Sequence, residues 1–334
     1  MRHYNIPIFI PQQACFNCCI YCNQHHISGQ LVQPTPTEII TKIKTYLQTF
    51  KEPYNAELAF FGGSFTAISH QKQEEYLQII QPYINQNKIS SIRISTRPDY
   101  ITPEILQTLK EYNVKTIELG AQSLSDEVLQ KSQRGHSAED VQKASKLINE
   151  YGFDLGLQMM IGLPKDTLER SIETAKQIVK LGAKSTRIYP TLVIENTQLA
   201  KMYRSGEYLP LEMSEAINWI SKLYNIFQEN NITILRVGLH PSEALISGKE
   251  LLAGPFHVSF RELVLSNMWK EKFESIAHKN ANTITIYVNP NYINSAVGYK
   301  SQNKISLQKI YKKVIFRGDL KAQMKYLGIS FIFA

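Results

Sequence analysis

The stretch Cys15-Phe-Asn-Cys-Cys-Ile-Tyr-Cys22 holds all four cysteines of a chain of 334 residues. Cys15, Cys19 and Cys22 follow the spacing C-x3-C-x2-C, and Cys18 lies inside it. Three thiolates cannot complete a four-ligand structural metal site, but they can bind three irons of a 4Fe-4S cluster and leave the fourth iron open. We therefore expect Cys15, Cys19 and Cys22 to be metal ligands and Cys18 to be a bystander.

A zinc site is the alternative for these cysteines, since His25 and His26 follow them closely. Zinc sites are usually built from two separated pairs of ligands, whereas the cysteines here form one compact group. The spacing therefore favours iron over zinc.

Strand-like and helix-like patterns alternate from the N-terminus onward. Apolar runs predict strands at residues 6–11, 57–61, 92–96, 115–120, 154–160 and 186–189, and helical patterns begin near residues 37, 69, 103, 126, 137 and 167. About six strand-then-helix units in a row are typical of an α/β protein with a parallel sheet covered by helices. Because each connection is right-handed, we expect a partial (β/α)6-type parallel barrel with its helices outside.

Glycines and polar residues follow the predicted strands at the points where they end. They are Gly62 and Gly63, residues 95–97, Gln122, Gln158 and Tyr189. Ligands of parallel α/β sheets bind beyond the carboxyl ends of the strands, and the first strand ends at the cysteines. These residues are therefore expected to converge on the cysteine segment.

The last third of the chain predicts additions to the barrel. A helix at 211–228 and a strand at 232–237 are expected outside it, followed by two turns that carry His240 and His257 as candidate substrate-site residues. We divide the chain into a core, 1–265, and a small C-terminal α/β appendage, 266–334. In the appendage, the loop 297–304 is polar and basic with one aromatic residue, which suits either an RNA contact or a solvated lid on the barrel edge.

Composition bounds the remaining classes. The net charge of +8 and a pI near 9.1 are compatible with nucleic-acid binding, but the basic residues are scattered through helices and never form a block of five. No apolar run approaches the roughly 18 residues that a membrane span needs, so no membrane association is expected. Clustered reduced thiolates indicate a reducing compartment, and we expect a cytoplasmic protein.

The cysteine motif after the first strand and the glycine pair after the second resemble the radical S-adenosylmethionine (SAM) superfamily. Within it, the chain most resembles the radical SAM portion of the Elongator catalytic-subunit family, over roughly residues 6–265. A looser resemblance is to the oxygen-independent coproporphyrinogen oxidases. The matching stretches are Cys22-Asn-Gln, Phe60-Phe-Gly-Gly-Ser-Phe-Thr, Thr96-Arg-Pro-Asp-Tyr-Ile, Gly120-Ala-Gln-Ser, Arg134-Gly-His, Met159-Met-Ile-Gly-Leu-Pro and Ile188-Tyr-Pro-Thr-Leu-Val.

This resemblance implies an enzyme that binds a 4Fe-4S cluster and SAM, receives an electron from a reducing donor, cleaves SAM, and takes a hydrogen atom from its substrate. It also implies a set of SAM contacts at the strand ends. The expected SAM-binding residues are Gly62, Gly63, Ser64, Ser95, Arg97, Gln122, Arg134 and Gln158.

Several of these residues also have plainer interpretations. The glycine pair suits any strand-to-helix turn, and Ser95 and Arg97 suit a solvent-facing turn. Arg134 suits a salt bridge on a helix surface. Gln158 lies in an apolar strand, where a buried amide needs partners, and SAM or the substrate is one candidate.

Two departures from the Elongator family limit the functional expectation. The chain is too short to hold the acetyl-CoA-dependent acyltransferase domain of that family's full-length members, and its cysteine spacing is the shorter form found across the superfamily. We therefore expect a radical SAM enzyme acting on an RNA base, with tRNA as the candidate substrate. The alternatives are a radical SAM enzyme for a small or tetrapyrrole-like metabolite, and a non-catalytic iron-sulfur or zinc protein.

Overall fold

A curved, seven-stranded sheet is the main feature of the computed structural model, which describes residues 2–11, 19–22, 32–275, 282–320 and 329–333. Every strand pair in it is parallel. The strands, in order across the sheet, are β1 (Arg2–Ile10), β2 (Tyr54–Gly62), β3 (Ser91–Thr96), β4 (Val114–Gln122), β5 (Asp154–Ile161), β6 (Ser185–Pro190) and β8 (Thr233–Val237). In the described residues β1 and β8 do not pair with each other, which confirms the predicted partial barrel.

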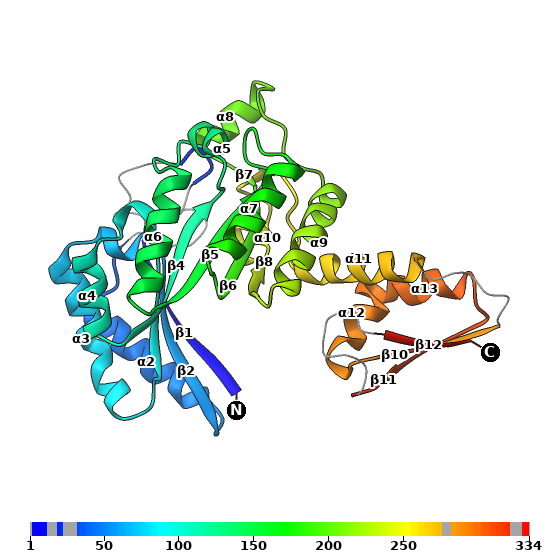
Figure 1. Ribbon diagram of the computed structural model, residues 1–334, viewed down its shortest axis with the longest axis horizontal. Coiled ribbons are helices and arrows are strands. Elements are labelled where there is room, and N and C mark those ends of the chain that lie inside the picture. The colour runs from blue at the N-terminus through cyan, green and yellow to red at the C-terminus, as the bar shows by residue number, and fades with distance from the viewer. Residues whose placement is uncertain (1, 12–18, 23–31, 276–281, 321–328, 334) are drawn as a thin grey trace.

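The connecting helices lie around the outside of this sheet (Figure 1). They are α2 (Pro36–Thr49), α3 (His70–Asn85), α4 (Pro103–Glu111), α6 (Ala138–Glu150), α7 (Leu168–Lys180) and α9 (Met213–Glu229), with short 3-10 turns η2 (Phe65–Ala67) and η3 (Pro98–Tyr100). Helices α5 (Asp126–Lys131) and α8 (Gln198–Arg204) instead lie at one end of the sheet, at the top of Figure 1. Their starts follow from sequence. In α2, for example, Thr35 and Glu38 form a capping box and Pro36 occupies the first turn.

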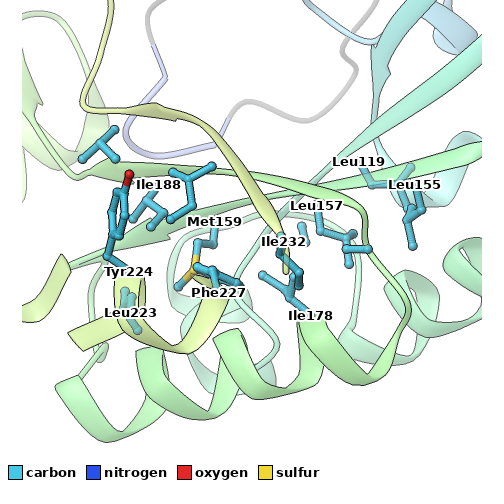
Figure 2. Packing of buried hydrophobic residues seen from close by; sticks show 14 of the residues in the cluster. Leu119, Leu155, Leu157, Met159, Ile178, Ile188, Leu223, Tyr224, Phe227 and Ile232 are labelled. Carbon is cyan, nitrogen blue, oxygen red and sulfur yellow. The ribbon is translucent and has the colours of Figure 1, made fainter. Parts of the chain in front are cut away.

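The core lies between the outer face of the sheet and these helices. Along β5, Leu157 and Met159 are fully buried and pack toward Ile178 of α7 and Phe227 of α9 (Figure 2). The alternate residues of each strand point to the inner, concave face, as the period of two requires. Core packing is expected from the sequence for both Met159 and Met160, but only Met159 is in the core, whereas half-buried Met160 lies on the inner face.

Strand β8 departs from the sequence prediction, which put residues 232–237 outside the barrel. It pairs with β6 and extends the sheet by a seventh strand. The reason is that α9 packs on α7 and returns the chain to the sheet, as in any strand-helix-strand unit. A short antiparallel pair, β7 (Val193–Ile194) with β9 (Leu251–Ala253), and the short helix α10 (Glu243–Ile246) lie among the connections.

The C-terminal part contains a separate three-stranded sheet beyond helix α11 (Phe260–Glu274). Strand β10 (Thr283–Val288) lies between β11 (Lys313–Gly318), which is parallel to it, and β12 (Ile329–Phe333), which is antiparallel. The remaining elements are η4 (Pro290–Tyr292), α12 (Ile293–Val297), η5 (Tyr299–Ser301) and α13 (Gln302–Gln308). Helix α11 runs through residue 265, so the division of the chain at that position stays a prediction.

Candidate active site

The end of β2 lies against the end of β1, directly before the cysteine segment. The amide of Gly63 donates a hydrogen bond to the carbonyl of Ile10 at 2.6 Å. Gly62 has a φ of +113°, and a Cβ at that position would lie 2.4 Å from the same carbonyl oxygen. Only glycine permits this approach. The pair therefore packs two strand ends together, and its contact with SAM stays a prediction.

Residues 19–22 form a turn that is held from two sides. The amide of Cys22 donates to the carbonyl of Cys19 at 3.0 Å. Between them, the amide of buried Ile20 donates to the carbonyl of Ser132 at 3.2 Å, and its carbonyl accepts from the amide of Leu199 at 2.8 Å. The C-terminal end of α5 and the start of α8 thus fix the second half of the cysteine motif.

The first half of the motif, with Cys15 and Cys18, and the pair His25 and His26 lie outside the described residues. Among the residues that are described, no group of three or more His, Cys, Asp or Glu side chains is arranged for a metal ion. The predicted three-cysteine ligand set therefore stays a prediction.

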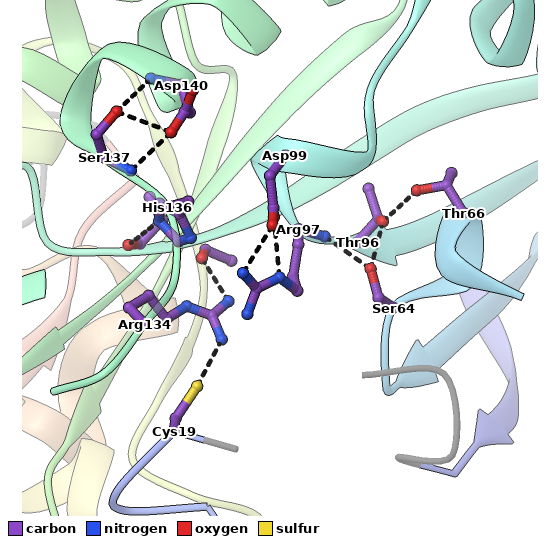
Figure 3. A network of polar contacts seen from close by, with 12 residues as sticks. Cys19, Ser64, Thr66, Thr96, Arg97, Asp99, Arg134, His136, Ser137 and Asp140 are labelled. Carbon is purple, nitrogen blue, oxygen red and sulfur yellow. Dashed lines mark hydrogen bonds and ion pairs between the residues drawn. The ribbon is translucent and has the colours of Figure 1, made fainter. Parts of the chain in front are cut away.

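Arg134 connects the cysteine turn to the sheet. Its Nη1 donates to the Cys19 sulfur at 3.1 Å and its Nη2 to the carbonyl of Gly120, on β4, at 2.8 Å (Figure 3). The side chain is buried, so it is not part of a helix-surface salt bridge. A guanidinium in this position is complementary to a thiolate, which is the form of cysteine that binds iron.

Arg97 is buried at the end of β3 and grips a carboxylate of the same loop. Its Nε and Nη2 donate to the two oxygens of Asp99 at 2.9 and 2.8 Å. Its Nη1, which is buried, has no hydrogen-bond partner in the described part of the chain. The planar fork of the Arg97 guanidinium is thus used by Asp99, and Nη1 is left for a ligand.

Ser64 ties the end of β2 to the end of β3. Its hydroxyl accepts a hydrogen bond from the amide of Arg97 at 3.0 Å and lies 2.7 Å from the hydroxyl of Thr96, which in turn lies 2.5 Å from that of Thr66 (Figure 3). All three hydroxyl side chains are buried. The role of Ser64 shown by these contacts is to hold two strand ends side by side.

His136 belongs to the same cluster and was not singled out from the sequence, although it ends the matching stretch Arg134-Gly-His. Its Nε2 lies 3.3 Å from the carbonyl of Ala121, and its buried Nδ1 has no partner among the described residues. Burial, together with the charges of Arg134 and Arg97, lowers the pKa of His136 to about 4. The ring is therefore neutral at pH 7.

The inner face of the barrel carries a row of alternating charges, with buried glutamates and half-buried arginines, that the sequence analysis missed. Arg93 Nε donates to Glu57 Oε2 at 2.7 Å and Arg93 Nη1 to Glu118 Oε1 at 2.8 Å. Arg187 Nε donates to Glu118 Oε2 at 2.6 Å. Burial alone would raise the pKa of Glu118, but the two arginines outweigh it and hold that pKa below its ordinary value.

Gln158 finds its partner in this row, since its Nε2 donates to Glu118 Oε2 at 2.9 Å. Ser95, on β3, is half-buried and is the register partner of Glu118. Tyr189 lies two residues beyond Arg187 on the same face. On the edge strand β8, half-buried Arg236 is the register partner of Arg187, and no carboxylate pairs with it in the described residues.

Gln122 and the two candidate histidines lie at different places. Gln122 ends β4 with a φ of +66°, where the β4–β5 register shifts. Eight other described non-glycine residues also have a positive φ, so its contact with SAM stays a prediction. His240 is exposed. His257 Nδ1 accepts from the amide of Ser259 at 2.9 Å, and its ring contacts Tyr299 edge-on at 5.3 Å. A substrate-site role for either histidine stays a prediction.

Comparison with protein families identifies this arrangement of a partial parallel barrel and a cysteine turn. The family model of the radical SAM superfamily matches residues 9–178, and that of the radical SAM C-terminal domain matches residues 183–270. The chain belongs to the radical SAM superfamily. It is a radical SAM enzyme, and the cofactors of this family are a 4Fe-4S cluster and SAM.

Individual relatives agree with this assignment. The chain is 30% identical over 185 residues to a tRNA uridine(34) acetyltransferase of Methanocaldococcus infernus, covering 49% of this chain and 35% of that protein. It is 26% identical over 232 residues to human Elongator complex protein 3, covering 64% and 41%. The chain therefore spans well under half the length of either curated relative.

Solved structures show the same fold. The structure of archaeal Elp3 from M. infernus, with an N-terminal deletion, matches with a TM-score of 0.62 and 23% identity, over 83% of this chain and 64% of that one. Coproporphyrinogen III oxidase from Escherichia coli matches with a TM-score of 0.50 and 16% identity, over 69% and 53%. Among the described residues no helix is long and apolar enough to cross a membrane.

The described residues fit the two cofactors. A guanidinium meets the Cys19 sulfur, and the turn at 19–22 is fixed to the barrel. Two buried nitrogen atoms have no protein partner in the described residues. They are the donor Nη1 of Arg97 and the ring nitrogen Nδ1 of His136. Polar atoms that are buried without partners are rare and require an explanation, and a bound ligand is one such explanation.

Proposed function

We propose that this protein modifies an RNA base, with tRNA as substrate, by radical SAM chemistry. The observation that carries the proposal is its similarity to proteins named tRNA uridine(34) acetyltransferase. The chain spans only part of those proteins, so the proposal is limited to hydrogen abstraction and does not include acetyl transfer. A cytoplasmic location and a reducing electron-donor partner belong to the same proposal.

The residues have distinct roles in this proposal. Cys15, Cys19 and Cys22 hold the 4Fe-4S cluster, and Arg134 fixes the cluster-binding turn to β4. When bound, the cluster and SAM together supply a 5'-deoxyadenosyl radical that removes a hydrogen atom from the substrate. Gly62 keeps the entry to the cysteine segment against β2.

The SAM-binding set keeps the members expected from the sequence, with roles adjusted to the contacts described above. Arg97 offers its remaining Nη1, and His136 is added as a neutral ring that can accept or donate one hydrogen bond. Gln158 and Ser95 lie beside Glu118 on the inner face of the barrel and shape the site there rather than gripping SAM directly. The full set is Gly62, Gly63, Ser64, Ser95, Arg97, Gln122, Arg134, His136 and Gln158.

The test is anaerobic reconstitution followed by reduction in the presence of SAM and tRNA. We expect 5'-deoxyadenosine to form faster with tRNA than without it, and we expect nucleosides of tRNA from deletion cells to lack one modification found in parent cells. A Cys22→Ala protein is the inactive control. Equal 5'-deoxyadenosine formation with and without tRNA, together with an unchanged nucleoside profile, would refute an RNA substrate.

A small anionic metabolite, such as a tetrapyrrole, is the second candidate. It is favoured by Arg236, which is half-buried, is the register partner of Arg187 and has no carboxylate partner in the described residues. The same assay separates the candidates, because a small-molecule substrate would stimulate 5'-deoxyadenosine formation in the absence of RNA. The non-catalytic alternative is not supported, since the superfamily is one of enzymes.

A further inference from the structure

The positive charge of this chain is concentrated in its last 53 residues. Residues 282–334 contain eight lysines and arginines and one acidic residue, a net charge of +7 out of +8 for the whole chain. The expectation that the basic residues are scattered through the chain is wrong for the excess of basic over acidic residues, nearly all of which lies in this segment. The barrel is nearly neutral, and the C-terminal module, residues 282–334, is strongly basic.

One face of the sheet in this module is covered. Ile284, Ile286 and Val288 of β10 are fully buried and belong to the hydrophobic core that includes α11, α12 and α13. Phe316 of β11 contacts Phe273 of α11 with ring centroids 6.1 Å apart. Figure 1 shows α11 and α13 on one side of the sheet. The alternate residues of β10 and β11 must therefore point away from the helices.

The opposite face, here called the uncovered face because no described helix packs on it, presents an aromatic ring beside two cations. On β10 it carries half-buried Tyr287, with threonines at the two preceding alternate positions. The register partner of Tyr287 on β11 is exposed Arg317, and Lys313 lies four residues earlier on the same face of that strand. In the described part of the chain, no carboxylate pairs with Arg317 or Lys313.

Single-stranded RNA has the chemistry that complements this face. A tyrosine on a sheet offers its ring for stacking against a base, and such stacking tolerates any base. Lysines and arginines along the neighbouring strand neutralise phosphates and release counterions. A neutral protein partner would leave the positive charges of Lys313 and Arg317 without a negative counterpart. The charge of the module therefore favours a polyanion as the ligand.

The module is held firmly to the barrel. The amide of Tyr299 donates to the hydroxyl of Ser266 on α11 at 2.7 Å, and Nδ2 of Asn303 donates to the carbonyl of Ser266 at 2.9 Å. Helix α11 begins against Gly238, which follows β8, and its 15 residues span about 22 Å. The uncovered face is thus about one helix length from the end of β8.

We propose that the face of the C-terminal sheet formed by Tyr287, Lys313 and Arg317 binds a single-stranded segment of the RNA substrate. This rests on the proposed function for the identity of the RNA, but binding itself does not depend on radical chemistry. The separation of about 22 Å requires a folded RNA that reaches both the barrel and the module, rather than a free nucleotide.

The test is fluorescence anisotropy with two probes, a tRNA transcript and a 12-nucleotide single-stranded RNA. The variants are the double substitution K313E/R317E, Tyr287→Ala and Tyr287→Phe. The matched control is K143E/K146E on α6, where both lysines are exposed and pair only with glutamates of their own helix, so the charge change is the same. Thermal unfolding checks that each variant is folded.

We expect K313E/R317E to weaken binding of both probes at least tenfold and to reduce the salt dependence by about 1.4 in log-log slope, the value for two phosphate contacts on a single strand. Tyr287→Ala should weaken binding about tenfold, whereas Tyr287→Phe should keep it within twofold, because the ring still stacks. The control and 5'-deoxyadenosine formation without RNA should be unchanged.

Other outcomes overturn either the inference or the proposed function, and they can be told apart. Wild-type binding that the C-terminal variants do not weaken more than the control overturns the inference alone. The absence of any RNA binding overturns the inference and the proposed RNA substrate together. Binding of polyglutamate that depends on Lys313 and Arg317, with no effect of Tyr287→Ala on RNA, also overturns the inference. RNA binding that depends on Tyr287 supports the inference. If deletion and parent cells then have the same tRNA nucleosides, and tRNA does not stimulate 5'-deoxyadenosine formation, the proposed function is refuted and the inference stands.

Discussion

The buried histidine of the candidate active-site cluster provides a stability prediction with a defined sign. The pKa of His136 is about 4 in the folded protein and near 6.5 in an unfolded chain. As the pH falls from 6.5 toward 4, His136 is protonated in the unfolded chain but stays neutral in the folded protein. His136 therefore contributes a loss of about 2.5 kcal/mol of unfolding free energy between pH 7.5 and 4.5.

A second buried group hides this loss in the wild-type protein. Burial raises the pKa of Asp166 to about 6, above its ordinary value of 3.8. As the pH falls, Asp166 is therefore protonated in the folded state at a higher pH than in the unfolded chain. This adds about 2 kcal/mol to the unfolding free energy between pH 7.5 and 4.5. The two contributions nearly cancel, so the wild-type pH profile alone does not reveal either group.

The substitution His136→Gln separates them, because glutamine does not titrate. We expect the unfolding free energy of the variant, relative to wild type, to rise by about 2.5 kcal/mol between pH 7.5 and 4.5. The measurement is urea unfolding of metal-free protein at four pH values, followed by tryptophan fluorescence. His70→Gln, at an exposed position, is the control. A relative stability of His136→Gln that stays constant with pH would contradict the argument.

Three further predictions follow from the site. Glu118→Gln should lower the unfolding free energy by about 3 kcal/mol, because two arginines lose a buried counter-charge, whereas an equal change at exposed Glu139 should have little effect in the same urea assay. Gly62→Ala should cost at least about 2 kcal/mol and lower cluster content, since its Cβ has no room and its φ is positive. Cys22→Ala should abolish iron and sulfide uptake on reconstitution, while Cys18→Ala should retain both; loss of the cluster from the latter would show that Cys18 is a ligand.

The sequence predicted the barrel because its signals are local. Strands with glycine or proline at their ends and helices with capping residues can each be recognised within a few residues, and their alternation has few solutions. Strand β8 was misplaced because the connection that precedes it contains the insertion β7 and α8, which interrupts the alternation. Its pairing with β6 depends on tertiary packing of α9.

The inner charged row could not be predicted in the same way. Glu57 and Glu118 are polar residues inside apolar strands, and nothing in the local pattern says which residues of the neighbouring strands face them. Their partners are set by register across several strands, which is fixed only when the barrel closes. His136 was missed for a related reason, since its pKa is lowered by burial and by the charges of Arg134 and Arg97, and Arg97 comes from a distant segment of the chain.

The shared carboxylate of Glu118 has a mechanical consequence. Arg93 on β3 and Arg187 on β6 both bind it, although three strand spacings, about 14 Å, separate those strands along the sheet. Concave curvature brings the two side chains within reach of one acceptor, so flattening the sheet would pull them apart. Glu118 thus links β3, β4 and β6 on the inner face of the barrel. A substrate large enough to push these strands apart must first lengthen the two charged contacts.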